Sequence, residues 1–554
     1  MTTVERDGRL VDRHETVFGI RTIRFDPDKG FLLNGERVQI RGVCLHHDLG
    51  ALGAALNVRA LTRQLEIMKE MGANAIRTSH NPPAPELLDL TDRMGLLVMD
   101  EVVDAWKNAK APNDYSRLYD EWYEKDLRAL IRRDRNHPSV IMWSTGNEVR
   151  EQKLPEGPAM AARHSAIARD EDPTRPVTGG HNNPGAGTSG YQKAFDVFGQ
   201  NYHLEAYPKY RAANPTRPLI ASETSSAVSS RGEYFFPVSD DKDAGRANFQ
   251  ISSYDLYAPR WGATPDDQFR ALEQAPSIAG EFVWTGFDYL GEPTPYNRDA
   301  TNVLNFSDPA DQQRMAAELK ELGKIRVPSR SSYFGIVDLA GFKKDRFYLY
   351  QAHWRPELPM AHLLPHWTWP ERVGQVTPVH VYTSGDEAEL FLDGRSLGRK
   401  RKAAFTYRLR WDGVTYQPGE LKVVAYRNGR PWATDTRRTA GPPAALELKA
   451  DRARIAADGR DLSFVTARVV DRRGELVPRA NQRIRFSVAG PGEIVATDNG
   501  DATSHVPFAA KERAAYNGLA LAIVRGRAGQ AGRVQVTAEA DGLAPARAVI
   551  QTAR

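Results

Sequence analysis

Two glutamates in this sequence follow apolar runs and can supply a pair of carboxylates that acts on one substrate. Glu148 closes the segment Trp143–Glu148, WSTGNE, and its neighbour Asn147 can hydrogen-bond a sugar hydroxyl. Glu223 directly follows the apolar run 219–222, LIAS. Two carboxylates that flank one glycosidic bond are the groups that hydrolyse it in most glycosidases. The question is which fold brings the two glutamates together.

Eight short apolar runs in the first 300 residues predict strands, and amphipathic helical patterns separate them. In one such pattern Leu61, Leu65, Met68 and Met71 fall close to one face. Apolar strands that alternate with helices indicate a parallel sheet covered by helices, and eight such units predict a closed (β/α)8 barrel, or TIM barrel. The runs are Val38–Val43, Asn74–Arg77, Leu96–Asp100, Val140–Trp143, Pro176–Gly179, Asp196–Gly199, Leu219–Ser222 and Ile278–Trp284.

Glu148 ends the fourth predicted strand and Glu223 the seventh, so the two can face each other across the barrel. In retaining glycosidases the two carboxyl groups stand about 5–5.5 Å apart. We therefore predict that Glu148 is the general acid/base and Glu223 the nucleophile. Tyr202, at the end of the sixth predicted strand, is expected to hydrogen-bond Glu223 and keep it ionised. An inverting hydrolase, with carboxyls about 6.5–9.5 Å apart, is the alternative on the same barrel.

Other interpretations of these glutamates stay open at this point. A glutamate after a buried strand can be a first-turn helix residue or a structural ion-pair partner, and this applies to Glu148 and Glu223 alike. Glu281 is a rival nucleophile, but it lies three residues before Trp284. On a regular strand these two side chains point to opposite faces, so Glu281 points away if Trp284 lines the site.

Polar and aromatic residues crowd the predicted strand ends. Aromatic rings stack on the apolar face of a pyranose, and amides, histidines and charged groups satisfy its hydroxyls, so this set suits a carbohydrate. Glu101 either contacts substrate or is a buried partner of Arg77, and His46 and His80 can instead be structural histidines. His181, after the fifth strand, is counted with the strand-end groups. The predicted substrate-binding residues are His46, Arg77, His80, Asn147, Tyr202 and Trp284.

Composition excludes several classes of protein. The chain has 554 residues, 41% hydrophobic and 26% charged, with a net charge of +5, which is ordinary for a multidomain globular protein and gives no reason to expect nucleic-acid binding. The single cysteine excludes an intrachain disulfide and cysteine-based metal sites. No apolar window reaches membrane-spanning length, and the charged N-terminus is no signal peptide. We expect a cytoplasmic protein, or a periplasmic or secreted one if a leader was lost; its oligomeric state, a homo-oligomer included, is open.

The pattern changes after about residue 356, where strict alternation and the hairpin turns Asp393-Gly394 and Asn428-Gly429 predict β-sandwiches. A Gly-Pro-Pro stretch at 441–443 separates two of them. The predicted fold is a TIM barrel followed by two immunoglobulin-like β-sandwich domains. The predicted domains are 1–35, a linker or remnant of a preceding β domain; 36–356, the barrel; 357–438, the first sandwich; and 439–554, the second.

Several motifs together resemble glycoside hydrolase family 2, the family of β-galactosidases, β-mannosidases and β-glucuronidases. The resemblance runs from about Phe18 onward, and it is greatest to bacterial β-galactosidase-type members with additional C-terminal sandwiches. It implies that Glu148 is the acid/base and Glu223 the nucleophile, and that His46, His80, Asn147, Tyr202 and Trp284 contact the sugar. The motifs, in chain order, are RGVCLHHD, NAIRTSHNP, VMDE, IMWSTGNE, IASET and GEFVWTGFDYLGEP.

The chain departs from the family pattern in three places. Members of the family carry a sugar-binding and an immunoglobulin-like domain before the barrel, so an inactive or sugar-binding fragment is the alternative to an active enzyme. Ala105–Lys107 stand where magnesium-dependent members have metal ligands, so we expect no metal and no cofactor. The segment 331–335 lacks the Asn-x-Lys that reads a uronic acid, which favours a β-galactosidase, with β-mannosidase or another β-glycosidase specificity as alternatives. The expected partner is a β-linked oligosaccharide or glycoside.

Overall fold

The computed structural model describes residues 1–296, 310, 313, 317 and 329–553, and two compact units make up the chain. Each unit is assembled from several segments that are distant in sequence. The four domain boundaries expected from the sequence stay a prediction. The first unit comprises Met1–His47, Ala73–Thr224 and Ala271–Val283, and the second comprises Asp48–Gly72, Ser225–Arg270 and Trp284–Arg554.

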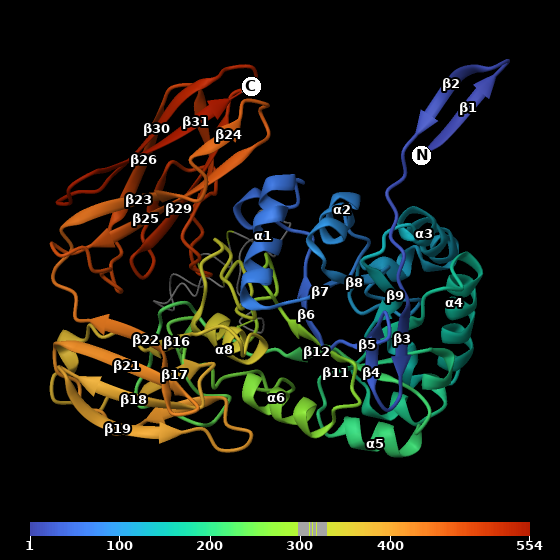
Figure 1. Cartoon of the computed structure of the whole chain (residues 1–554), viewed down its shortest axis with the longest axis horizontal. Helices are drawn as coiled ribbons and strands as arrows, with labels where there is room; N and C mark the ends of the chain where they lie inside the picture. The colour runs from blue at the N-terminus through green and yellow to red at the C-terminus, as the bar shows by residue number, and fades with distance from the viewer. Residues whose placement is uncertain (297–309, 311–312, 314–316, 318–328, 554) are drawn as a thin grey trace. The chain divides into compact units, whose positions relative to one another are not determined.

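A closed barrel of eight parallel strands forms the first unit's centre (Figure 1). Neighbouring strands follow chain order, and the last strand pairs with the first, with Phe282 opposite Gly42, which closes the ring. The structure thus confirms the predicted barrel. Its strands are β6 (Ile40–Leu45), β7 (Ala75–Thr78), β8 (Leu97–Glu101), β9 (Val140–Asn147), β10 (Val177–His181), β11 (Phe198–Asn201), β12 (Leu219–Ser225) and β15 (Gly280–Trp284).

Helices that follow the barrel strands pack their apolar sides on the barrel (Figure 1). In the longest of them, α3, Leu127, Leu130 and Ile131 are buried, whereas Trp122 on the same helix is 41% exposed. The first unit contains the helices α2 (Pro85–Met94), α3 (Tyr119–Asp134), α4 (Gly157–Glu171) and α5 (Ala206–Ala213) and the short helices η2 (Tyr115–Arg117), η3 (Arg150–Lys153), η4 (Pro184–Gly187) and η5 (Tyr191–Ala194).

Short antiparallel strands precede the barrel. The hairpin of β1 (Thr2–Arg6) and β2 (Arg9–His14) has every residue exposed. A small sheet of β3 (Ile23–Asp26), β4 (Gly30–Leu33) and β5 (Glu36–Arg37) follows it.

In the second unit, α1 (Val58–Met71) begins at Asn57, whose side chain accepts a hydrogen bond from the Ala60 N–H, and ends at Gly72 with a φ of 111°. Its Leu61, Leu65, Met68 and Met71 are buried, as the sequence pattern predicted. Within the residues that the structure describes, no helix has both the length and the apolar character needed to cross a bilayer. The second unit also contains the described elements η1 (Gly50–Leu52), β13 (Arg246–Ala247), β14 (Gln250–Ile251), α8 (Asp345–Trp354) and η7 (Pro370–Arg372). Helix α6 (Pro265–Gln274) contributes residues to both units.

Two sheets follow α8 and confirm the predicted change to β structure. One has the strand order β16-β17-β20 and the other β19-β18-β21-β22. The hairpin turns at Asp393-Gly394 and Asn428-Gly429 have positive φ at both residues, as two-residue turns between twisted strands require. The strands are β16 (Ala361–Leu364), β17 (Val379–Thr383), β18 (Glu387–Leu392), β19 (Arg395–Arg401), β20 (Arg408–Trp411), β21 (Glu420–Arg427) and β22 (Arg430–Arg438).

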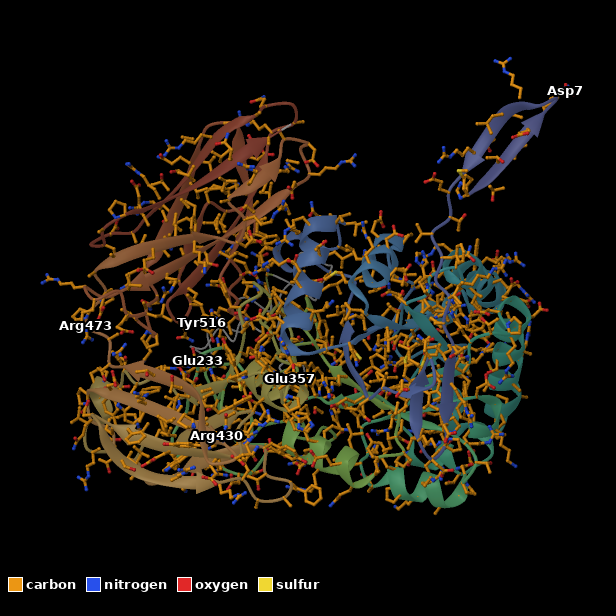
Figure 2. All side chains as sticks on the ribbon, in the orientation of Figure 1. Asp7, Glu233, Glu357, Arg430, Arg473 and Tyr516 are labelled. Atoms are coloured by element: carbon orange, nitrogen blue, oxygen red, sulfur yellow. The ribbon has the colours of Figure 1, made fainter. Side chains whose placement is uncertain are left out.

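The C-terminal sandwich consists of a β23-β25-β29-β27 sheet and a β24-β31-β30-β26-β28 sheet. Val465 and Val524 from the first and Ile484 and Val536 from the second share one buried core. Charged side chains such as that of Arg473 point outward (Figure 2). The strands are β23 (Ala445–Ala450), β24 (Arg454–Ala456), β25 (Leu462–Val470), β26 (Arg483–Ala489), β27 (Gly492–Asp498), β28 (Glu512–Ala514), β29 (Leu519–Gly526), β30 (Gly532–Glu539) and β31 (Ala546–Ala553).

Candidate active site

Buried polar side chains gather at the carboxyl ends of the barrel strands. Glu101, Asn147 and Asn201 are the last residues of β8, β9 and β11, and Arg77 and Glu223 lie near the ends of β7 and β12. Each of these five residues is at most 3% exposed. Burying this many charges and amides costs free energy unless they are paired, so such a cluster indicates a site rather than a packing core.

The guanidinium of Arg77 connects the cluster. It donates to Glu223 Oε2 at 2.8 Å, Glu101 Oε2 at 2.9 Å and Asn147 Oδ1 at 2.8 Å. A further hydrogen bond of 2.9 Å goes to the carbonyl oxygen of Ser222, next to Glu223. Burial would lower the pKa of Arg77, but its carboxylate partners, Glu101 above all, outweigh burial and raise it. Arg77 is therefore a fixed positive charge in contact with Glu223.

Glu148 follows β9 with a φ of 46°, in the left-handed region. That conformation costs a side-chain-bearing residue about 1–2 kcal/mol. Its backbone N–H donates to the carbonyl of Gly180 at 2.8 Å. Its two carboxylate oxygens accept hydrogen bonds from Asn201 at 2.9 Å and from Asn182 at 2.8 Å. The strain is in the backbone of Glu148, and the two amides hold its carboxylate in one orientation.

Glu223 is in a different electrostatic environment. Burial raises the pKa of the Glu223 carboxyl from 4.5 to about 8, although Arg77 opposes the shift. The negative charge of Glu148 raises this pKa further, and His80, whose Nε2 lies 3.8 Å from Glu223 Oε2, lowers it. Glu148 and Glu223 are therefore close enough to interact electrostatically.

Glu223→Gln is expected to stabilise the fold at alkaline pH. Between pH 4.5 and about 8 the folded protein binds the Glu223 proton more tightly than the unfolded chain does, so the unfolding free energy of the wild type falls as pH rises. A glutamine stays neutral, so the variant does not lose this unfolding free energy as pH rises. Thermal unfolding should show a Tm gain of several degrees above pH 8 that shrinks toward pH 4.5. A variant less stable than wild type at pH 9 would contradict the prediction.

A third carboxylate, Glu101, supports the site from β8. His80 Nδ1 donates to Glu101 Oε1 at 2.6 Å, and the Ser144 hydroxyl donates to Oε2 at 2.6 Å. Burial would raise the pKa of Glu101, but Arg77, His80 and Ser144 together outweigh burial and lower the pKa to about 2. The ring of His46 lies edge-on to that of His80, with centroids 5.9 Å apart. Glu101 is thus the buried partner of Arg77, one of the two roles expected from the sequence.

The amide of Asn147 is oriented by groups from several strands. Its Oδ1 accepts from Arg77 and, at 3.0 Å, from Asn201 Nδ2. Its Nδ2 donates to Asp104 Oδ1 at 3.0 Å and lies 3.3 Å from His80 Nε2. Lys110 Nζ in turn donates to Asp104 Oδ1 at 2.7 Å. These bonds fix which end of the amide faces which neighbour.

His181 does not lie with the strand-end groups, contrary to expectation. Its ring stacks on Phe198, with centroids 4.6 Å apart, and its Nδ1–H donates to the carbonyl of Gly199 at 2.9 Å. Burial lowers the pKa of His181 to about 4. Because side chains alternate along a strand, its neighbour Gly180 is the β10 residue that faces the cluster.

Gly180→Ala is expected to disrupt the cluster. A Cβ at Gly180 would lie 2.7 Å from Arg77 Nη2, 2.7 Å from Asn147 Oδ1 and 3.0 Å from Asn201 Oδ1. Overpacking of this kind costs about 1–3 kcal/mol, and displacing catalytic groups by about 1 Å can lower activity by about 10²-fold. The measurements are thermal unfolding and kcat/KM. Gly185→Ala, where a Cβ makes contacts of 3.4 Å or more, is the control and should change neither.

The remaining predicted residues are placed as follows. The backbone N–H of Tyr202 donates to the carbonyl of Glu223 at 2.8 Å; a bond from its hydroxyl to Glu223 stays a prediction. Trp284 is the last residue of β15, and its role in substrate binding also stays a prediction. Glu281 accepts from the hydroxyl of Thr224 at 2.7 Å. Since Thr224 and Glu223 point to opposite faces of β12, Glu281 lies on the face away from Glu223.

Sequence reasoning missed Asn182 and Asp104. Asn182 directly follows β10, and Asp104 lies in the loop after β8. The one available signal was their position just past a predicted strand end, where barrel side chains converge. Many loop residues share that position, so the sequence did not distinguish these two.

Comparison with known proteins places this architecture in a family. The family description "Glycosyl hydrolases family 2, TIM barrel domain" matches residues 26–297. The description "Glycoside hydrolase family 2 C-terminal domain 5" matches residues 446–549, and a domain of unknown function matches residues 374–433. The first two matches fall on the barrel and on the C-terminal sandwich.

Among curated relatives, a β-galactosidase of Bacteroides ovatus is 41% identical over 585 aligned residues, covering 98% of this chain and 65% of that protein. A β-glucuronidase of Bacteroides fragilis is 26% identical, covering 78% of this chain and 58% of that protein. The chain thus spans less than two thirds of the length of either relative.

Solved structures of glycoside hydrolases also resemble this chain. A β-glycosidase from Bacteroides vulgatus superposes with a TM-score of 0.85 at 30% identity, covering 99% of this chain and 68% of that one. A glycosyl hydrolase family 2 member from Bacteroides cellulosilyticus superposes with a TM-score of 0.83 at 31% identity, covering 100% of this chain and 67% of that one. Matched by these structures over its whole length and by the family descriptions at both its barrel and its C-terminal sandwich, the chain belongs to glycoside hydrolase family 2.

Proposed function

We propose that this protein is a retaining exo-β-glycosidase that hydrolyses terminal β-linked sugars by double displacement. The observation that carries the proposal is the Glu148 and Glu223 pair at the ends of β9 and β12, which Asn201, Asn147 and Arg77 join into one hydrogen-bonded cluster. Double displacement uses a pair of carboxylates that flank the scissile bond, one as acid/base and the other as nucleophile, and this pair supports that proposal.

Each glutamate has one role in the proposed reaction. Glu223 Oε attacks the anomeric carbon while Glu148 protonates the departing glycosidic oxygen, so the C–O bond breaks as a glycosyl-enzyme ester forms. Glu148, now ionised, takes a proton from water, and the water oxygen attacks the same carbon and releases Glu223. Arg77 favours the ionised form of Glu223, and the amides of Asn182 and Asn201 hold Glu148 in position.

A β-galactoside is the substrate best supported. The β-galactosidase of Bacteroides ovatus shares 41% identity with this chain, and the segment 331–335 lacks an Asn-x-Lys uronate reader. A β-glucuronide is the second candidate, because a β-glucuronidase of Bacteroides fragilis is also among the relatives. A β-mannoside is the third, on the family resemblance.

A panel of 4-nitrophenyl glycosides distinguishes these candidates. We expect kcat/KM for the β-galactoside to exceed that for the β-glucuronide and β-mannoside by about 10²-fold or more, because a site that hydrogen-bonds one hydroxyl pattern leaves buried groups unpaired with another. A preference for the glucuronide would replace the galactosidase assignment and leave the mechanism standing.

An inactive sugar-binding protein is the alternative, since the chain spans 65% of its β-galactosidase relative. Calorimetry with free galactose separates the two proposals. Binding of galactose without turnover of any aryl glycoside would favour the sugar-binding protein over the hydrolase.

A further inference from the structure

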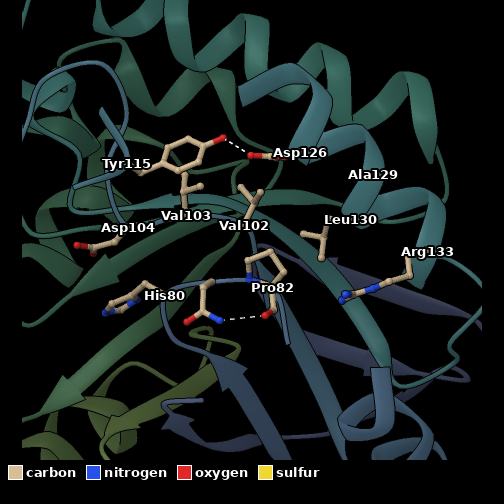
Figure 3. Close-up of a pocket in the computed structure, with 11 residues that line it drawn as sticks. His80, Pro82, Val102, Val103, Asp104, Tyr115, Asp126, Ala129, Leu130 and Arg133 are labelled. Atoms are coloured by element: carbon tan, nitrogen blue, oxygen red, sulfur yellow. Dashed lines mark hydrogen bonds between the residues drawn. The ribbon is translucent and has the colours of Figure 1, made fainter. Parts of the chain in front are cut away.

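The neighbours Asn147 and Glu148 have their hydrogen-bonding partners on different sides of β9. Asn147 Nδ2 donates to Asp104 and lies near His80, two residues from the loops after β8 and β7 that also line a cavity of about 410 Å³ (Figure 3). Glu148 is bonded on the other side of β9, where Asn182 Nδ2 donates to its Oε2 at 2.8 Å. The hydrogen bonds that orient the Glu148 carboxylate therefore come from the side of β10 and β11.

Gln152 holds the amide of Asn182 from the loop after β9. It is 5% exposed and lies in η3, four residues after Glu148. Its Nε2 donates to Asn182 Oδ1 at 2.7 Å, and its Oε1 accepts from the backbone N–H of Asn183 at 3.0 Å. Gln152 thus bonds two consecutive residues of the loop that follows β10.

These bonds determine which end of each amide faces which neighbour. The backbone N–H of Asn183 can only donate, so the Gln152 oxygen faces it and the Gln152 nitrogen faces Asn182. That nitrogen needs an acceptor, so Asn182 presents its oxygen to Gln152 and its own nitrogen to Glu148. An Asn182 amide in the reverse orientation would place its oxygen against the carboxylate, and the two acceptors would repel each other. Gln152 therefore excludes the reverse orientation.

The second amide at Glu148 has an orienting group of its own. Asn201 Nδ2 donates to Glu148 Oε1 at 2.9 Å, and Asn201 Oδ1 accepts from the Ser222 hydroxyl at 2.7 Å. Each carboxylate oxygen thus accepts a hydrogen bond from an amide whose opposite end is fixed. A carboxylate has about four acceptor directions, so directions remain for the proton that general acid catalysis transfers.

We propose that Gln152 is a positioning residue for the acid/base: it fixes the Asn182 amide and thereby holds the Glu148 carboxylate in the orientation that protonates the glycosidic oxygen. The inference rests on the proposed function, since it takes Glu148 as the acid/base. Gln152 acts on Glu148 through Asn182, to which it is bonded. Its loss should therefore impair protonation of the leaving group and leave the attack by Glu223 unchanged.

The test compares two β-glycosides of the preferred sugar that differ in their need for a proton. A 2,4-dinitrophenolate leaves without protonation, whereas the methoxide of a methyl glycoside must be protonated as it leaves. We expect Gln152→Met to lower kcat/KM for the methyl glycoside about tenfold or more, as a misplaced catalytic group does, and kcat/KM for the dinitrophenyl glycoside about twofold or less. The ratio of the two kcat/KM values is the readout, because a general loss of folded protein lowers both values equally.

Gln192→Met is the matched control. Gln192 is 4% exposed and has the same bonding pattern, with its Nε2 donating to Asn214 Oδ1 at 3.0 Å and its Oε1 accepting from the Gly190 N–H at 2.8 Å. The nitrogen of this asparagine, however, donates to the carbonyl of Gly187 and not to a carboxylate. The control should lower the thermal unfolding temperature as Gln152→Met does and leave the ratio of the two kcat/KM values at that of wild type.

A double-mutant cycle tests whether Gln152 acts through Asn182. Asn182→Leu should reproduce the selective loss, and adding Gln152→Met to it should lower kcat/KM for the methyl glycoside no further. Unchanged kinetics in Gln152→Met, equal losses on both glycosides or additive losses in the double variant would overturn the positioning role. A wild type that hydrolyses neither glycoside would instead overturn the proposed function, and the positioning role with it.

Discussion

Glu148→Ala is expected to lower kcat/KM for a 4-nitrophenyl β-galactoside by about 10²–10⁴-fold, the usual contribution of general acid–base catalysis. Glu223→Gly should lose more, about 10⁴-fold or beyond, because no covalent intermediate can form without the nucleophile. In the proposed mechanism both side chains take part in each step, so neither can compensate for the loss of the other. The measurement is steady-state hydrolysis with thermal unfolding to verify the fold.

Azide separates the two roles. It should rescue the Glu148 variant with formation of a β-glycosyl azide, because Glu223 still forms the intermediate that azide attacks. In the Glu223 variant it should give the α-glycosyl azide by direct displacement. Glu281→Gln is the control, a buried glutamate near the same strands whose carboxylate bonds to Thr224 instead of to the cluster. Unchanged activity in the Glu148 or the Glu223 variant, or exchanged azide products, would contradict the assignment of the acid/base and nucleophile roles.

Arg77→Met is expected to cost both stability and activity. It leaves Glu101 and Glu223 buried without their shared cation, and breaking a buried ion pair in this way costs about 3–5 kcal/mol. The pKa of Glu223 is raised by burial to about 8 even though Arg77 opposes the shift, so removal of Arg77 raises this pKa further. Since the nucleophile must be ionised, the acid limb of the pH profile of kcat/KM should move to higher pH.

Arg175→Met is the matched control for this variant. Arg175 is also buried and paired, with Asp172 at 2.6 Å, but its other bonds go to backbone carbonyls before β9 and at its start. It should lower the unfolding free energy without moving the acid limb. An Arg77→Met enzyme whose acid limb coincides with that of wild type would show that Arg77 has a structural role only.

Much of the fold could be predicted because it follows from local pattern. The eight apolar runs predicted the barrel, and turns such as Asp393-Gly394 predicted the hairpins, because strand burial and positive φ each require particular residue types. Side-chain direction was harder. His181 was expected at the site, yet it points into the layer of helices and Gly180 faces the cluster. Whether one residue or its neighbour faces the site depends on where β10 begins, and the sequence leaves that open by one residue.

By itself the sequence determined that Glu148 and Glu223 lie at the ends of the fourth and seventh of eight strands, where the two carboxylates can face each other across one barrel. Only the tertiary structure decided what surrounds them: Arg77 bonded to Glu223 and Glu101, and Asn182 and Asn201 bonded to Glu148. The reason is physical. Strand order follows from apolar runs along the chain, whereas a charge in a buried site acquires its partners from strands far apart in sequence, and those partners are defined only when the barrel closes.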